Sequence, residues 1–144
     1  MPLVDHLGVT VADLDVAVAQ WNPVLTALGL VTDGREFEGG VAWNAPGETE
    51  IILYRAPVAP RQPFRTGQLG WQHLAFAVES RAEVERLHAV AVQSGWTSVR
   101  APKGFPRFSE QYYASFVEDA SGIRLEFMHN PPRDTTSAGG SGSV

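Results

Sequence analysis

Two segments far apart in the chain share one pattern of residues, and this internal repeat limits the possible folds more than any other feature. The segments are "DHLGVTVADLD", from Asp5 to Asp15, and "QHLAFAVESRA", from Gln72 to Ala82. Each runs from a polar residue through His-Leu and alternating apolar positions to a polar residue that can cap a helix. Such self-similarity indicates copies of one supersecondary unit. The sequence therefore predicts two related modules.

A helix is predicted after each repeat, over residues 13–28 and 80–94. Asp13 and Ser80 are good N-cap residues, and the glutamate three positions after Ser80 completes a capping box. The residues that follow place apolar side chains at helical spacing, and each segment ends at a glycine that suits a C-cap. Pro23 is expected to kink the first helix or to split it.

Strand patterns follow both helices. The predicted strands cover residues 30–37, 41–43 and 51–54 in the first half, and 96–100, 112–117 and 123–128 in the second. Together with the first strand of each repeat, each half has the order β-α-β-β-β, and the fold class is α+β. We predict one domain over residues 1–130, with module 1 at about 3–56, a proline-rich linker at 57–69 and module 2 at about 70–130. The apolar-poor tail, residues 131–144, is predicted to be disordered.

Charge and composition narrow the kinds of partner. The formal net charge is -5, whereas nucleic acids and anionic membranes are bound by basic patches. No apolar run approaches the roughly 20 residues that span a bilayer, and the chain starts without a secretory signal pattern, so we expect a cytoplasmic protein. Since the chain has no cysteine, any metal must be held by histidine, carboxylate or water.

The strand pattern places three possible metal ligands on equivalent faces. Side chains alternate between the two faces of a strand, so His6 and His73 point away from the helix-packing face and lie beside small residues. In "GIRLEFMHN", Glu126 takes the corresponding face of the last strand. Each residue alone has an ordinary explanation: a strand histidine is more often structural, and Glu126 could face solvent or pair with Arg124. The coincidence of the three favours a divalent metal.

The remaining histidines lack that support. His88 falls on a predicted helix and His129 at the end of a strand, and we interpret both as structural or surface residues.

The two modules, with "DHLGVTVADLD", "WQHLAFAVES" and "YYASFVEDASGIRLEF", resemble the vicinal oxygen chelate superfamily. This group includes glyoxalase I, fosfomycin and bleomycin resistance proteins and extradiol dioxygenases, and the likeness extends from about Leu3 to about Asn130. The resemblance implies a partly closed barrel of about eight strands around a metal. Carried over by position, the implied ligands are His6, His73 and Glu126. It also implies a homodimer, and leaves open whether the site forms within one chain or between chains that exchange modules.

The fourth ligand position of glyoxalase I is apolar in this chain. Matching the two final strands places Leu53 opposite Glu126, and a one-residue slip would place Ile52 there. Two histidines and one carboxylate form a facial triad that leaves open positions on the metal, which we expect to be Fe, Mn, Zn, Ni or Co.

The resulting hypothesis is a metal-dependent enzyme that chelates a small substrate through vicinal oxygens. The reaction is left open between lyase, isomerase, transferase and ring-cleaving dioxygenase chemistry. Glu126 and Tyr113 are the candidate catalytic residues, with Tyr112 as the alternative tyrosine. The insertion at 101–111 is either a loop that closes over the site or an ordinary surface loop. The alternative hypothesis is a metal-free drug- or metabolite-binding protein similar to the bleomycin resistance proteins.

Overall fold

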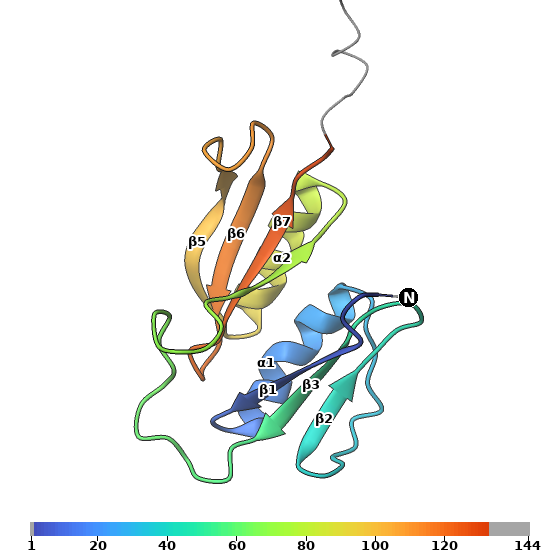
Figure 1. Ribbon diagram of the computed structural model, residues 1–144, viewed down its shortest axis with the longest axis vertical. Helices are drawn as coiled ribbons and strands as arrows, with labels where there is room; N and C mark the ends of the chain where they lie inside the picture. Colours follow the sequence, from blue (N-terminus) through green and yellow to red (C-terminus); the bar gives the residue numbers. More distant parts are fainter. Residues whose placement is uncertain (1, 133–144) are drawn as a thin grey trace, which may run out of the picture.

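The computed structural model describes residues 2–132, which form two modules with seven strands and two helices (Figure 1). Module 1 contains β1 (His6–Val11), α1 (Leu14–Ala27), β2 (Gly40–Trp43) and β3 (Glu50–Arg55). Module 2 contains β4 (Leu74–Ala77), α2 (Arg81–Gln93), β5 (Thr97–Gly104), β6 (Tyr113–Glu118) and β7 (Arg124–His129). In this part of the chain no helix has the length and apolarity to cross a membrane. Residues 133–144, nearly all of the predicted tail, lie outside the described residues.

The two sheets repeat one topology. Their strand orders are β1-β3-β2 and β4-β7-β6-β5, with β1 parallel to β3 and β4 parallel to β7. β1 therefore corresponds to β4, β3 to β7 and β2 to β6. The α+β class and the two-module arrangement are confirmed, as two open sheets of three and four strands without a closed barrel.

The strand predicted over residues 30–37 is wrong, which explains why module 1 lacks a counterpart of β5. Only isolated bridges, Val31 with Asn44 and Phe37 with Gly40, form there. Between them the short polar side chains bond to their own backbone: Thr32 Oγ1 accepts from the Gly34 N–H at 3.0 Å, and Asp33 Oδ1 from the Arg35 N–H at 2.9 Å. Such local bonds compete with a strand ladder.

Both helices begin at the predicted caps. Asp13 Oδ1 accepts from the Val16 N–H at 3.1 Å, and Ser80 Oγ accepts from the Glu83 N–H at 3.1 Å. The prediction that Pro23 splits the first helix is wrong, because α1 runs unbroken through it. Trp21, Val24 and Leu25 are wholly buried around the proline, and this packing outweighs the one lost backbone hydrogen bond.

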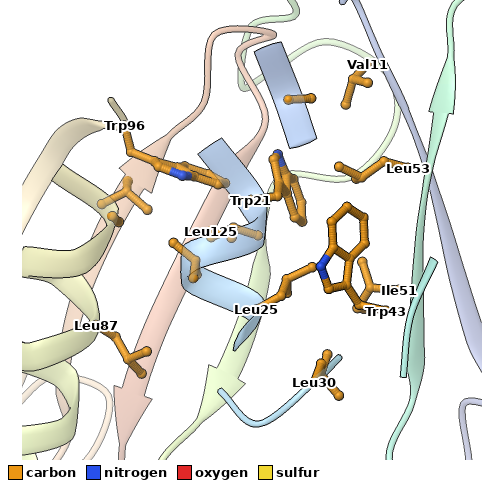
Figure 2. Packing of buried hydrophobic residues seen from close by; sticks show 14 of the residues in the cluster. Val11, Trp21, Leu25, Leu30, Trp43, Ile51, Leu53, Leu87, Trp96 and Leu125 are labelled. Atoms are coloured by element: carbon orange, nitrogen blue, oxygen red, sulfur yellow. The ribbon is translucent and has the colours of Figure 1, made fainter. Parts of the chain in front are cut away.

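One core joins the modules, and α1 stands between sheet 1 and module 2 (Figure 2). Trp21 of α1 lies against Trp96 of module 2, with ring centroids 5.2 Å apart. The Trp21 indole N–H donates to Asp119 Oδ2 at 2.8 Å, in the turn before β7. The buried side chains on both sides of α1 belong to a single hydrophobic cluster. The two modules therefore pack as one unit.

Candidate functional site

The first strand of module 1 places its side chains as the alternation predicts. Leu7 and Val11 are buried against α1, whereas the side chain of His6 is 61% exposed on the other face. The His6 ring bonds through Nδ1 to Asp5 Oδ1 at 2.7 Å. In β4 the same alternation places Leu74 and Phe76 toward the core.

Strand register identifies the residue of module 1 that corresponds to Glu126. Gly8 is the partner of Ile52 in the β1–β3 ladder, and Ala75 is the partner of Glu126 in the β4–β7 ladder. Since Gly8 and Ala75 each lie two positions after the repeated histidine, Ile52 is the counterpart of Glu126. The first alignment, with Leu53 in that place, is wrong, because Leu53 faces the core and is fully buried. The one-residue slip to Ile52 is correct, and the position is apolar as expected.

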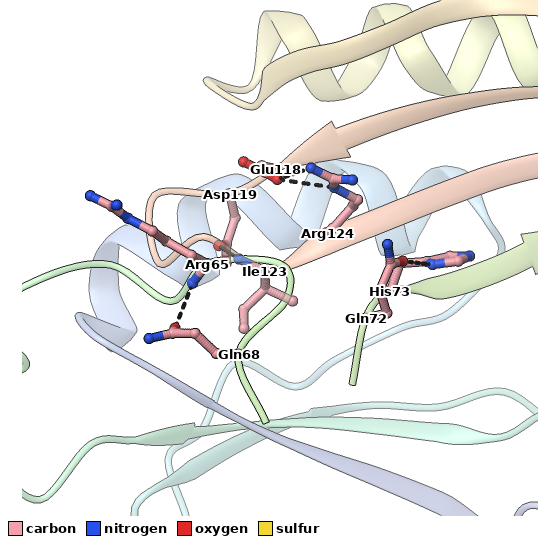
Figure 3. A network of polar contacts seen from close by, with 8 residues as sticks. All are labelled: Arg65, Gln68, Gln72, His73, Glu118, Asp119, Ile123 and Arg124. Carbon is pink, nitrogen blue, oxygen red and sulfur yellow. Dashed lines mark hydrogen bonds and ion pairs between the residues drawn. The ribbon is translucent and has the colours of Figure 1, made fainter. Parts of the chain in front are cut away.

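The carboxyl group of Glu126 is buried and contacts two side chains, His73 and Tyr112. Its side chain is only 4% exposed, and Oε2 lies 2.9 Å from His73 Nε2. Oε1 accepts from the Tyr112 hydroxyl at 2.6 Å. Arg124 does not compensate this carboxylate, because its guanidinium is paired with Glu118 at 2.7 Å (Figure 3). Glu126 is thus a buried carboxyl group opposite an imidazole, and within residues 2–132 no arginine or lysine forms an ion pair with it.

A second contact fixes the orientation of the His73 ring. Nδ1 of His73 bonds to the side-chain oxygen of Gln72, as Figure 3 shows. An N–H at Nδ1 leaves the Nε2 lone pair directed at Glu126, and a lone pair facing a carboxylate requires a proton or a metal ion between them. His73 Nε2 and Glu126 Oε2 are therefore two potential metal ligands that face each other.

Tyr112, and not Tyr113, reaches Glu126. The Tyr113 hydroxyl donates to Glu85 of α2 at 2.8 Å, on the helix-facing side of β6. Of the two candidate tyrosines, the alternative, Tyr112, is therefore the one that contacts Glu126. Strand alternation could have found this, since Tyr112 shares its parity with Phe116, whose β7 partner is Glu126. Burial and the hydrogen bond to Glu126 raise the pKa of Tyr112, so its hydroxyl stays protonated and acts as a donor.

His6 does not join this pair within one chain. Among residues 2–132, no group of three or more His, Asp or Glu side chains is close enough to hold a metal ion. His6 lies on sheet 1, whereas His73 immediately precedes β4 in sheet 2. A single chain supplies two of the three predicted ligands, and its described residues do not by themselves fit a three-ligand metal.

Aromatic rings wall the His73–Glu126 pair. Phe116 packs edge-on to His73, with centroids 5.6 Å apart, and Phe105 packs against Phe116 at 5.9 Å. β5 extends to Gly104, so the predicted 101–111 loop begins at Phe105, which is buried rather than free. His73 also borders a cavity of about 230 Å³ that Trp71 and Ile123 line. His73 thus contacts the aromatic wall and lines a small, mostly apolar cavity.

Comparison with known proteins agrees with this fold. Residues 3–127 match the Glyoxalase/Bleomycin resistance protein/Dioxygenase superfamily. The chain belongs to this superfamily. The resemblance predicted from the repeat is therefore confirmed over nearly all of the described chain.

Two curated proteins are similar to this chain over most of their length. The uncharacterised protein YqjT of Bacillus subtilis is 22% identical over 123 residues, 85% of this chain and 95% of its own. An uncharacterised protein of Pseudomonas aeruginosa is 30% identical over 134 residues, 91% of each chain.

Two solved structures share the fold. A glyoxylase/bleomycin resistance protein/dioxygenase domain from Frankia has a TM-score of 0.73 at 22% identity, over 91% of this chain and 99% of its own. Lactoylglutathione lyase from Agrobacterium tumefaciens has a TM-score of 0.62 at 18% identity, over 90% and 95%.

Proposed function

We propose that the protein is a divalent-metal enzyme whose site combines His73 and Glu126 of one chain with His6 of a second copy. It would chelate a small substrate through neighbouring oxygens, the starting point shared by lyase, isomerase, transferase and dioxygenase reactions in this superfamily. The cytoplasmic location favoured by the sequence is part of the proposal. The observation that carries it is the buried Glu126 carboxyl group, 2.9 Å from an imidazole nitrogen and not paired with an arginine or lysine among the described residues.

Edge strands support a second copy as the source of His6. β1 and β4 are end strands of their sheets, so each has a row of backbone groups without a partner strand. Between the sheets lies a groove of about 690 Å³ lined by both apolar and polar residues. Its apolar lining includes Val4, Leu28, Leu30, Leu74, Phe76 and Val78. A dimer that seats β1 of one chain along β4 of the other would cover this groove and bring the two histidine-bearing ends together.

The chain's own residues would orient the donors and the substrate. A bound metal would supply Lewis acidity. Tyr112 holds the Glu126 carboxylate in one rotamer, and Gln72 does the same for the His73 ring. Phe105 and Phe116 exclude water from one side of the pair, which strengthens electrostatic interactions within it. Burial and the contact with Glu126 raise the pKa of Tyr112, so its hydroxyl stays protonated and keeps donating to Glu126.

Metal analysis of protein purified without a nickel column tests the proposal. We expect about one equivalent of metal per chain for the wild type, and a loss of about hundredfold in affinity in His6→Ala, His73→Ala and Glu126→Gln. His129→Ala is the matched control, because this ring bonds to the Val78 carbonyl at 2.9 Å and should leave the metal content unchanged. Wild-type protein that binds none of Mn, Fe, Co, Ni or Zn would refute it.

Mixing two inactive variants tests the second copy. Unfolding and refolding His6→Ala together with Glu126→Gln yields heterodimers in which one site regains all three ligands. Random pairing restores about a quarter of the sites, whereas a site built within one chain stays empty in every pairing. Metal content and native mass of the mixture are the measurements.

One observation favours the second candidate function, a metal-free binding protein for a drug or metabolite. The described residues of one chain bring only two ligands together, beside a cavity with an exposed tryptophan, Trp71. A metal-free wild type that still binds small molecules in this cavity would favour that function.

A further inference from the structure

Tyr54 lies flat across the open face of sheet 1, on the side away from α1. It belongs to the central strand β3, and glycines stand on both neighbouring strands. A methyl group at Gly8 would lie 3.0 Å from Tyr54 Cε2, and one at Gly40 would lie 3.0 Å from Cδ1 and Cε1. Any larger residue at either position would lift the ring. The two glycines therefore let one face of the ring rest on the sheet while the other faces outward.

The exposed ring is the floor of a cavity. Its volume is about 550 Å³, and Ile52 and Ala42 extend the floor along the sheet. Phe37 stands at its side and is 77% exposed, although it is one of the largest apolar side chains of module 1. Two aromatic residues thus border one hollow, and the packing of the core requires neither of them there.

A tight turn fixes Phe37 beside this floor. Phe37 and Gly40 exchange backbone hydrogen bonds of 2.8 and 3.0 Å, and the two residues between them have φ of 49° and 80°. This is a two-residue hairpin turn of type I′, in which Asn-Gly is preferred. Glu38 occupies the first position instead, the one residue other than glycine with a positive φ among residues 2–132. Backbone preference does not explain a glutamate there.

The rim of the cavity is acidic. Arg35 pairs with Asp33 at 3.1 Å and Arg55 with Glu36 at 3.0 Å, so both nearby arginines are neutralised. Glu38 and Glu50 also line the cavity, and neither has an ion-pair partner within the described part of the chain. Their field disfavours a negatively charged occupant.

The same platform does not occur in module 2, so the fold does not require it. By the ladder registers, Tyr54 corresponds to Met128, Gly40 to Ala114 and Gly8 to Ala75.

We propose that the cavity over Tyr54 binds a planar aromatic ring, neutral or positively charged, stacked on the outward face of the tyrosine. Offset stacking on the tyrosine and edge contact with Phe37 supply the attraction, and a positive charge adds a cation–π contribution. The site needs neither the His73–Glu126 pair nor a bound metal. None of the residues that line it is a proposed metal ligand, so the failure of the metal proposal would leave it intact.

Calorimetric titration with three compounds built on one bicyclic ring tests the site: N-methylquinolinium, quinoline and quinoline-4-carboxylate. We expect the affinity to fall in that order. Tyr54→Leu should weaken N-methylquinolinium binding about tenfold, whereas Tyr54→Phe should stay within about twofold of the wild type. Phe108→Leu is the matched control, because Phe108 is an exposed aromatic residue on the other module and should change nothing.

Amide chemical shifts report where the ring binds and whether the variants are folded. N-methylquinolinium should shift the amide signals of Gly8 and Gly40 in the wild type and in Tyr54→Phe. In the double variant Glu38→Gln, Glu50→Gln, the ratio of the affinity for N-methylquinolinium to that for quinoline-4-carboxylate should fall by about threefold or more. A wild type that binds none of the three compounds, a Tyr54→Leu variant that is folded and binds like the wild type, or tightest binding of the carboxylate would overturn the proposal.

Discussion

Module 1 and module 2 have equivalent strand orders, yet the open faces of their sheets carry different chemistry. At corresponding positions, Ile52 stands in sheet 1 where Glu126 stands in sheet 2, and Tyr54 stands where Met128 stands. The helix-facing positions in the middle of β3 and β7 are apolar and buried: Ile51, Leu53, Leu125 and Phe127. Packing therefore restricts one face of each sheet, while the other is free to differ. On this second face, module 2 carries the His73–Glu126 pair, and module 1 carries the Tyr54 ring.

The helices differ in the same way at one buried position. Trp21 and His88 lie the same number of residues after their caps, Asp13 and Ser80, and both face the interior. Trp21 is fully buried and donates to Asp119. His88 is smaller, bonds to Ser98 Oγ at 2.9 Å through Nε2, and has a buried Nδ1 without a hydrogen-bond partner. The core shared by the modules thus depends more on module 1's helix than on module 2's.

The largest effect is expected from truncating these two residues. Trp21→Ala should lower the free energy of unfolding by about 3–5 kcal/mol, because it empties the contact with Trp96 and leaves Asp119 without its indole donor. His88→Ala should lower it by only about 1–2 kcal/mol. Urea denaturation followed by circular dichroism measures both, with the exposed Trp71→Ala as the control. If Trp21→Ala and His88→Ala lowered the free energy of unfolding equally, the core would not depend more on α1 than on α2.

A smaller effect is expected from pH, again through His88. Burial lowers the pKa of His88 below its ordinary value, so between that lowered pKa and about 6.5 the unfolded chain binds more protons than the folded one. Stability is therefore highest above about pH 6.5 and falls as the pH drops below it. The loss between about pH 7 and about pH 5 should be smaller in His88→Gln than in the wild type. The same pH dependence in both proteins would show that His88 does not titrate in the core.

The smallest effect is expected at the turn of module 1. Glu38→Gly should raise the free energy of unfolding by about 1 kcal/mol, since glycine adopts a positive φ without steric strain. Thermal melting measures the gain, and Glu48→Gly is the control at another exposed glutamate. A melting temperature that falls in Glu38→Gly would mean that the glutamate stabilises the turn and is not there for the cavity.

Local sequence patterns determined the repeat, the helix caps and the face that each strand side chain takes. These follow from spacings of a few residues, where hydrogen-bond geometry and strand alternation act within one element. His73 and Glu126 could be predicted as neighbours for this reason, since alternation and equivalent strands suffice to bring them to one face. The same alternation would also have selected Tyr112 over Tyr113.

The tertiary structure decided which elements lie side by side. The register that matches Ile52 with Glu126 depends on ladders between strands far apart in sequence, and a slip of one residue exchanges the two faces. The separation of His6 from Glu126 depends on how the modules pack around α1, which no local pattern encodes. The flat ring of Tyr54 likewise needs Gly8 and Gly40, and these meet it only once β1 and β2 pair with β3. Such contacts join distant segments, so only the folded chain fixes them.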